Sequence, residues 1–144
     1  MNPILLQRIS YQLRGFPSAA KMITYLIRFI FNCYLPYNLK LGRNFVLGYG
    51  GLGVVIHERT IIGDDCHIDQ NVTIGGTSKL YDVPKLGNKV YVGAGAKIIG
   101  PIKIGDNVVV GANAVVVNDV PSGSLVVGIP GKVIKSNIDK NDYV

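Results

Sequence analysis

The chain has 144 residues, a formal net charge of +6 and 48% hydrophobic side chains. This length is enough for one domain with its own core, and two cysteines, Cys33 and Cys66, are too few for a disulfide framework. The first apolar stretch lacks the flanks of a cleavable signal peptide, so we expect a reduced, cytoplasmic protein.

The positive charge is concentrated in the first 40 residues, which contain no acid at all. No platform of mixed aromatic and basic residues accompanies these charges, so nucleic acid is not expected as a partner. An anionic membrane surface or an anionic cofactor suits them better. The basic residues of this segment are Arg8, Arg14, Lys21, Arg28 and Lys40.

Two helices are predicted in an N-terminal segment of residues 1–38. The first covers residues 3 to about 14; the second runs from about 18 to 34, with Ser18 as its N-cap and Pro36 ending it. Lys21 and Arg28 interrupt the second helix, so it is not expected to span a membrane. Two alternatives remain open. Residues 18–34 pack on the following domain or a neighbouring subunit, or they make peripheral contact with the inner face of the membrane.

An aliphatic residue then recurs at intervals of six, with one interval of nine after Leu47. Hexapeptide repeats are typical of parallel β-helices, in which each repeat forms one short strand and a turn. We therefore predict an all-β fold of about four triangular coils over residues 39–134. The first and fifth residues of each repeat should point inward, with Cys66 as a core side chain. The series is Leu41, Leu47, Ile56, Ile62, Ile68, Ile74, Leu80, Leu86, Val92, Ile98, Ile104, Val110 and Val116.

Two stretches depart from the repeat. Residues 48–55 contain three extra residues, and residues 75–85 have polar and turn residues where core is expected, which predicts a protruding loop. After Val116 the chain is expected to leave the β-helix through residues 120–124. Residues 135–144 should form a frayed polar tail.

Three segments carry a resemblance to a known family: IIGDDCHIDQNVTIGGT (61–77), residues 84–121, and VVGIPGKVIK (126–135). They resemble the hexapeptide-repeat acyltransferases, and among them the serine acetyltransferase-like branch, which includes acetyltransferases of bacterial surface polysaccharides. The resemblance implies a left-handed β-helix, a homotrimer, acetyl-CoA as acyl donor and no metal. It also implies that Lys132 meets the phosphates, with Lys135 as a second candidate, and that small residues contact the pantetheine arm, namely Gly93, Ala94, Gly95, Gly111 and Ala112.

The general base is less clear, because the family's two histidine positions are occupied here by Tyr49 and Val83. Imidazole suits base catalysis at neutral pH, and the chain has only His57 and His67. Asp69 or Glu58 would orient one of them. Catalysis by either histidine, an unusual Tyr49 mechanism and lost activity all remain open.

The resemblance leaves the acceptor open as well. A short basic N-terminal segment favours a sugar hydroxyl of a bacterial surface polysaccharide precursor. Serine O-acetyl transfer in cysteine biosynthesis is the alternative, and a catalytically lapsed β-helix is the second alternative. A zinc-dependent carbonic anhydrase site is excluded, because it needs three histidines and the chain has two.

Overall fold

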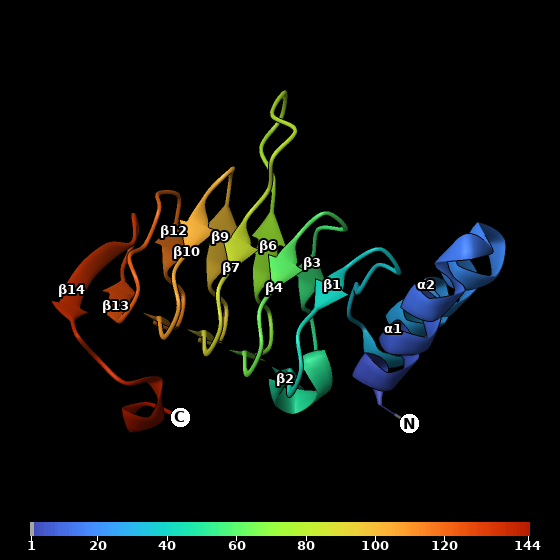
Figure 1. Ribbon diagram of the computed structural model, residues 1–144, viewed down its shortest axis with the longest axis horizontal. Helices are drawn as coiled ribbons and strands as arrows, with labels where there is room; N and C mark the ends of the chain where they lie inside the picture. The colour runs from blue at the N-terminus through green and yellow to red at the C-terminus, as the bar shows by residue number, and fades with distance from the viewer. Residues whose placement is uncertain (1) are drawn as a thin grey trace.

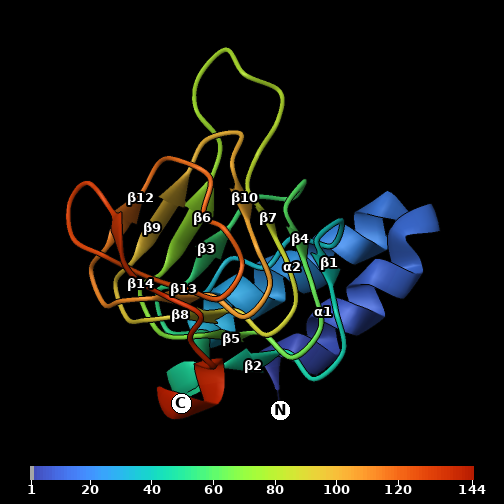
Figure 2. The same cartoon turned by 60° about the vertical axis from the view of Figure 1, so that its left-hand side comes forward.

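The computed structural model describes residues 2–144 as a left-handed parallel β-helix of about four coils with two α-helices at its N-terminal end (Figure 1). Three sheets form the sides of a triangular prism, as Figure 2 shows. Sheet I contains β1 (Lys40–Leu41), β4 (Ile61–Ile62), β7 (Lys85–Leu86) and β10 (Lys103–Ile104). Sheet II contains β2 (Val46–Leu47), β5 (His67–Ile68), β8 (Tyr91–Val92), β11 (Val109–Val110), β13 (Ser124–Val127) and β14 (Lys132–Ser136). Sheet III contains β3 (Val55–Ile56), β6 (Thr73–Gly75), β9 (Lys97–Ile99) and β12 (Val115–Val116).

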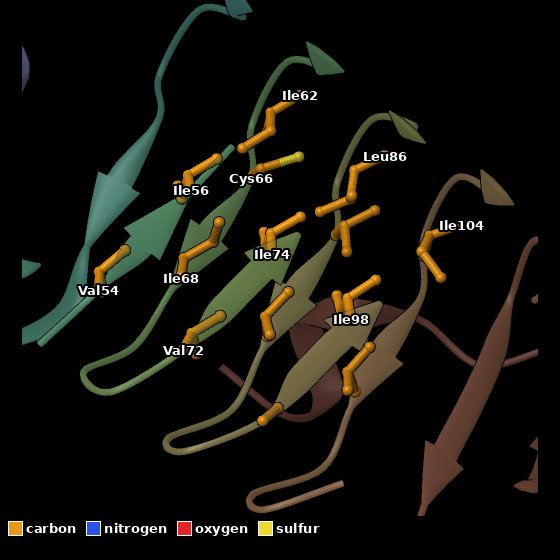
Figure 3. Packing of buried hydrophobic residues seen from close by; sticks show 14 of the residues in the cluster. Val54, Ile56, Ile62, Cys66, Ile68, Val72, Ile74, Leu86, Ile98 and Ile104 are labelled. Carbon is orange, nitrogen blue, oxygen red and sulfur yellow. The ribbon is translucent and has the colours of Figure 1, made fainter. Parts of the chain in front are cut away.

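The core is a stack of aliphatic side chains inside the prism (Figure 3). The parallel register places Ile74 beside Ile98 and Ile98 beside Val116, so each residue packs against its equivalents in the coils above and below. Cys66, at a fifth position, is fully buried. The inward positions predicted from the repeat are thus confirmed, with one exception. Leu80 is 53% exposed, because it lies on the protruding loop.

Apart from the irregular Gly48–Gly51 turn of the first coil, two of the three corners turn through one residue with positive φ in each coil. Asparagine, aspartate and glycine adopt this conformation at low cost, and they supply all but one of these residues. The corner between sheets I and II uses Asn44, Asp65, Lys89 and Asn107, and the corner between sheets II and III uses Gly53, Asn71, Gly95 and Asn113.

The helical cap, residues 2–31, closes the first end of the prism (Figure 1). It contains α1 (Pro3–Gln12) and α2 (Pro17–Phe31). Ser18 is not the N-cap that we predicted: Phe16 is the N-cap, and α2 begins at Pro17, whose preset φ suits the first turn. The helix also ends before Pro36, at a left-handed Asn32. Within the described residues, no helix is both long and apolar enough to cross a membrane.

The other end of the prism differs from the prediction. The chain does not leave the β-helix at residues 120–124: Val120 forms a bridge with Ile104, and β13 pairs in parallel with β11. β14 then folds back antiparallel on β13. The tail is not frayed either, because Asn107 Nδ2 donates to Ile138 O at 2.7 Å and Lys140 Nζ donates to Asp65 O at 3.0 Å. Strand pairing with β13 and hydrogen bonds to polar partners on the prism hold the segment in place.

Candidate functional site

One corner of the prism carries small residues where the equivalent corner carries polar ones. We call residues 93–95 and 111–113, at the corner between sheets II and III, the glycine–alanine edge. Adjacent coils approach closely here, since a Cβ on Gly93 would lie 2.8 Å from Ala112 N. Gly93 is therefore required by coil packing, whatever else the edge does.

Two amides of the glycine–alanine edge, those of Ala94 and Ala112, are free, whereas its other amides bond to neighbouring coils. At the corner between sheets I and II, the side chain of each coil accepts a hydrogen bond from the amide one coil below: Asn88 Oδ1 from Asp64 N at 2.8 Å, and Asp106 Oδ1 from Asn88 N at 2.6 Å. The equivalent positions at the other corner are Ala94 and Ala112, which have no such oxygen. Among residues 2–144, the amides of Ala94 and Ala112 have no hydrogen-bond partner. The edge thus presents a row of donors to a ligand.

A polar cluster lies beside the lower end of this edge. Asp69 is in the coil below Gly93, and its carboxylate accepts a hydrogen bond from Tyr91 Oη at 2.7 Å. His67 Nε2 lies 3.1 Å from Asp69 Oδ1, within ion-pair range, although the angle is not that of a hydrogen bond. The His67 ring meets the Tyr91 ring edge-on, with centroids 5.4 Å apart. The side chains of His67 and Asp69 are only 23% and 17% exposed.

Burial and the neighbouring carboxylate affect the Tyr91 phenol. Burial first, and then the hydrogen bond to Asp69, raise the pKa of Tyr91 to about 12. The phenol therefore stays protonated at neutral pH and donates to Asp69. Nε2 of His67 is buried and faces the Asp69 carboxylate, so this nitrogen is not part of the exposed surface of the ring. This arrangement favours a proton on Nε2 and a free lone pair on Nδ1.

The irregular turn that we singled out in the sequence lies at the same corner. It is a distorted 3-10 turn, Gly48–Gly51, in which Tyr49 has a φ of 50° and is 82% exposed. Gly48 lies against the Asp69 side chain, and Asn71 N donates to Leu52 O, so Gln70 lies over this turn. Gln70 Oε1 and His67 Nε2 are two of the four buried polar side-chain atoms without a hydrogen-bond partner in the described chain. Of these two atoms, His67 Nε2 faces the Asp69 carboxylate, whereas Gln70 Oε1 has no partner within the described chain.

His57 is not in this group. It lies beyond β3, at the corner between sheets III and I, and its Nδ1 accepts a hydrogen bond from Arg59 N at 3.2 Å. Glu58 also lies at this corner, where it lines a hollow of about 330 Å³ under the protruding loop. Arg59 fixes that loop by stacking on the Tyr81 ring at 4.3 Å and donating to Tyr81 O. Val83 is buried at the base of the loop.

Lys132 lies at the upper end of the glycine–alanine edge. The register of the last hairpin pairs it with Val127, and a Cβ on Gly111 would lie 2.8 Å from Val127 Cγ1. The row therefore runs from Asp69 through Gly93, Gly111 and Val127 to Lys132, which is exposed. Four steps at the inter-strand spacing of roughly 4.8 Å give a length of about 19 Å.

Neither thiol belongs to this row. Cys33 and Cys66 are both buried, and burial raises the pKa of Cys66 and raises the pKa of Cys33 to about 11. A neutral, buried thiol is a poor nucleophile. Residues 2–144 also contain no group of three or more His, Cys, Asp or Glu side chains placed to hold a metal ion.

Sequence reasoning missed Tyr91 and the free amides. Tyr91 occupies an outward position of an ordinary repeat, and only the register β5–β8 places it beside His67. A signal was nevertheless present. Residues 24 positions apart become neighbours where the protruding loop adds six to the usual 18, and the sequence places Tyr91 at that distance from His67.

Comparison with known proteins identifies the family to which this fold belongs. Residues 84–118 match the family model described as bacterial transferase hexapeptide (six repeats). A serine acetyltransferase from Synechococcus elongatus is 46% identical over 126 residues, which cover 86% of this chain and 51% of that protein. One from Staphylococcus epidermidis is 45% identical over 119 residues, covering 81% and 55%. The crystal structure of serine acetyltransferase from Brucella abortus in complex with coenzyme A is 30% identical, with a TM-score of 0.90, covering 94% and 56%.

The chain is therefore a hexapeptide-repeat protein of the serine acetyltransferase-like type. It spans about half the length of the curated relatives it matches. The family resemblance and the left-handed β-helix predicted from the sequence are confirmed.

Proposed function

We propose that the chain is an acetyl-CoA-dependent O-acetyltransferase that uses the glycine–alanine edge to bind the acyl donor. The free amides of Ala94 and Ala112 carry this proposal, because they offer hydrogen bonds to the carbonyl groups of a thin, extended arm. Gly93, Gly95 and Gly111 let that arm approach the main chain. The coenzyme A complex of the Brucella abortus relative supports the same donor.

The length of the edge suits this ligand. A pantetheine arm has about the backbone length of four residues, or roughly 14 Å when extended. This fits within the row from Asp69 to Lys132. With the thioester at Asp69, Lys132 and the nearby Lys135 would meet the phosphates at the other end as positive charges.

His67 is the general base in this proposal, and Asp69 positions it. His67 lies beside the edge with its Nε2 facing the Asp69 carboxylate, which leaves Nδ1 to accept a proton. His57 is less suited, because its Nδ1 lone pair is already engaged by Arg59 N. Tyr49 lies near the same site and would border the acceptor.

The transfer is a single direct displacement. His67 Nδ1 takes the proton of the acceptor hydroxyl as its oxygen attacks the thioester carbonyl carbon. The carbon–sulfur bond then breaks, and the proton passes to the departing thiolate, so the products are an O-acetyl ester and coenzyme A. Neither buried cysteine takes part, and the step needs no metal.

Serine is the first candidate acceptor, because the relatives are serine acetyltransferases. A sugar hydroxyl of a surface polysaccharide precursor is the second. The observation that favours it is the basic helical cap, with no acid in the first 40 residues and an exposed apolar face. The free amides of Ala94 and Ala112 argue against a lapsed β-helix.

A homotrimer would complete the site. The glycine–alanine edge is an outward corner of a prism, so one subunit contacts a linear ligand from one side only. A neighbouring subunit would enclose the other side, and exposed apolar residues of the first coils, Val46, Leu52 and Val55, offer surface for it. Sedimentation velocity would test this directly: a monomer at micromolar concentration contradicts it.

The deciding measurement is thiol release from acetyl-CoA, with L-serine and with sugar acceptors in parallel. Serine-dependent release on the order of 1–1000 per second would identify a serine acetyltransferase. Release with a sugar only would identify the second candidate. If folded protein binds acetyl-CoA but neither serine nor a sugar supports release, both candidate acceptors are contradicted and the lapsed β-helix is favoured.

A further inference from the structure

Helix α2 has a second apolar face that covers nothing in the protein. Met22, Tyr25, Leu26 and Phe29 are spaced i, i+3, i+4 and i+7, so they form one continuous stripe, which we call the α2 stripe. These side chains are exposed, with Phe29 at 90%, Met22 at 69% and Tyr25 at 62%. Such a row of large apolar residues on a surface indicates an interaction site.

The stripe is not needed for packing the cap. The opposite face of α2 does that work, because Ala20, Thr24 and Ile27 are buried and Ile27 belongs to the core of the β-helix. Truncating a side chain of the α2 stripe should therefore leave the fold intact.

The charges around the stripe have one sign. At 100° per residue, Lys21 and Arg28 lie together on the Tyr25 side of the stripe, two turns apart, and both are exposed. The first 40 residues contain no acid, and neither ion pair of the described chain includes a residue of the cap. Glu58 lines a hollow together with Lys21 but forms no ion pair with it. Lys21 and Arg28 are therefore uncompensated.

A two-fold contact with a second copy of the chain fits this face poorly. A symmetric contact would place each α2 stripe against its own copy and bring the basic rims together, with no acid in the cap to pair with them. An anionic lipid surface fits both features, because it accepts the apolar side chains and attracts the lysine and arginine beside them.

We propose that the α2 stripe binds the surface of an anionic lipid bilayer, with Phe29 and Met22 entering the acyl boundary and Lys21 and Arg28 meeting lipid headgroups. Tyr25 suits the interface because its ring is apolar and its hydroxyl is polar. The helix would lie in the plane of the surface, not across it. This inference stands apart from the transferase proposal, because none of its residues belongs to the glycine–alanine edge.

Vesicle sedimentation with the full chain tests the proposal. We expect binding to vesicles of phosphatidylcholine with phosphatidylglycerol, weakened by salt, and little binding to phosphatidylcholine alone. Phe29→Gln keeps helix propensity and should weaken binding at least about tenfold. Lys21→Gln with Arg28→Gln should weaken it by roughly fivefold for each charge.

Two matched controls separate this face from general effects. Leu80→Gln removes an exposed apolar side chain from the protruding loop, and Lys85→Gln with Lys103→Gln makes the same change in net charge on sheet I. Both should bind as the parent does. Equal losses in the controls, or no binding by the parent, would overturn the proposal. The proposal would also be overturned if Phe29→Gln dissociated an oligomer without changing vesicle binding, because a second copy would then cover the α2 stripe.

Discussion

Ala112→Asn tests the glycine–alanine edge most sharply, because it should stabilise the fold while weakening donor binding. At the corner between sheets I and II, Asn88 Oδ1 accepts a hydrogen bond from Asp64 N at 2.8 Å. Ala112 occupies the equivalent position at the other corner, one coil above Ala94. An asparagine there would cap the free Ala94 amide in the same way, and Ala112 is exposed, so the side chain fits.

The magnitudes follow from one hydrogen bond. A neutral hydrogen bond contributes a net of about 0.5–1.5 kcal/mol, which for this size of domain raises the melting temperature by about 2–4 °C per kcal/mol. For acetyl-CoA the same change removes one donor and leaves a carbonyl of the arm unpaired. That loss costs about 1–3 kcal/mol, or roughly 5- to 150-fold in affinity.

Thermal unfolding at fixed protein concentration and calorimetric titration with acetyl-CoA measure the two effects. The mirror-image control is Asn88→Ala, which uncaps Asp64 N and should lower stability by a similar amount without changing acetyl-CoA affinity. Raised stability with unchanged affinity in Ala112→Asn would refute the assignment of this edge to the donor.

The remaining predictions concern the base, the thiols and the core. Asp69→Asn keeps an oxygen for Tyr91 but removes the charge 3.1 Å from His67, so kcat should fall about 100-fold or more while the KM for acetyl-CoA stays within twofold. The control Asp65→Asn should change neither constant. An unaffected kcat in Asp69→Asn contradicts the role of Asp69. Neither thiol should react with a disulfide reagent at pH 8 until the protein is denatured, and early reaction would contradict their burial. Because burial raises the pKa of Cys33 to about 11, the folded chain keeps a proton that the unfolded chain loses above pH 9; stability should fall between pH 9 and 11, and less so in Cys33→Ala. Ile98→Ala should cost about 2–5 kcal/mol in denaturant unfolding, and the outward Ile61→Ala much less.

The fold was predictable because a period of six constrains both the strands and the core. Each aliphatic residue of the series except Leu80 occupies the same place in its coil, so Ile74, Ile98 and Val116 are three independent indications of the same strand geometry. The ends carry no repeated information. Proline and serine are both common at helix starts, so only the structure shows that α2 begins at Pro17 and not after Ser18.

The candidate site was predictable in part. The sequence singled out Tyr49 through an irregular turn, Asp69 as a partner for a histidine and Gly93 through the family resemblance, and the structure places all three at one corner. It could not separate His57 from His67. Both residues lie next to an inward position, and their difference depends on which corner each occupies and on what its nitrogens contact.

The two corners show why a repeat protein needs so few changes to gain a binding site. A coil corner exposes one amide that its own strand cannot use, and each such amide must find an acceptor or face water. Asn88 and Asp106 solve this within the chain, because each side chain reaches the coil below. Where alanine replaces them, the same backbone keeps its shape but leaves its donors in a line at the coil spacing. The hydrogen bonds that the chain does not make at that corner can then be made to a ligand. The residue type at one repeated position therefore distinguishes a structural corner from a functional one.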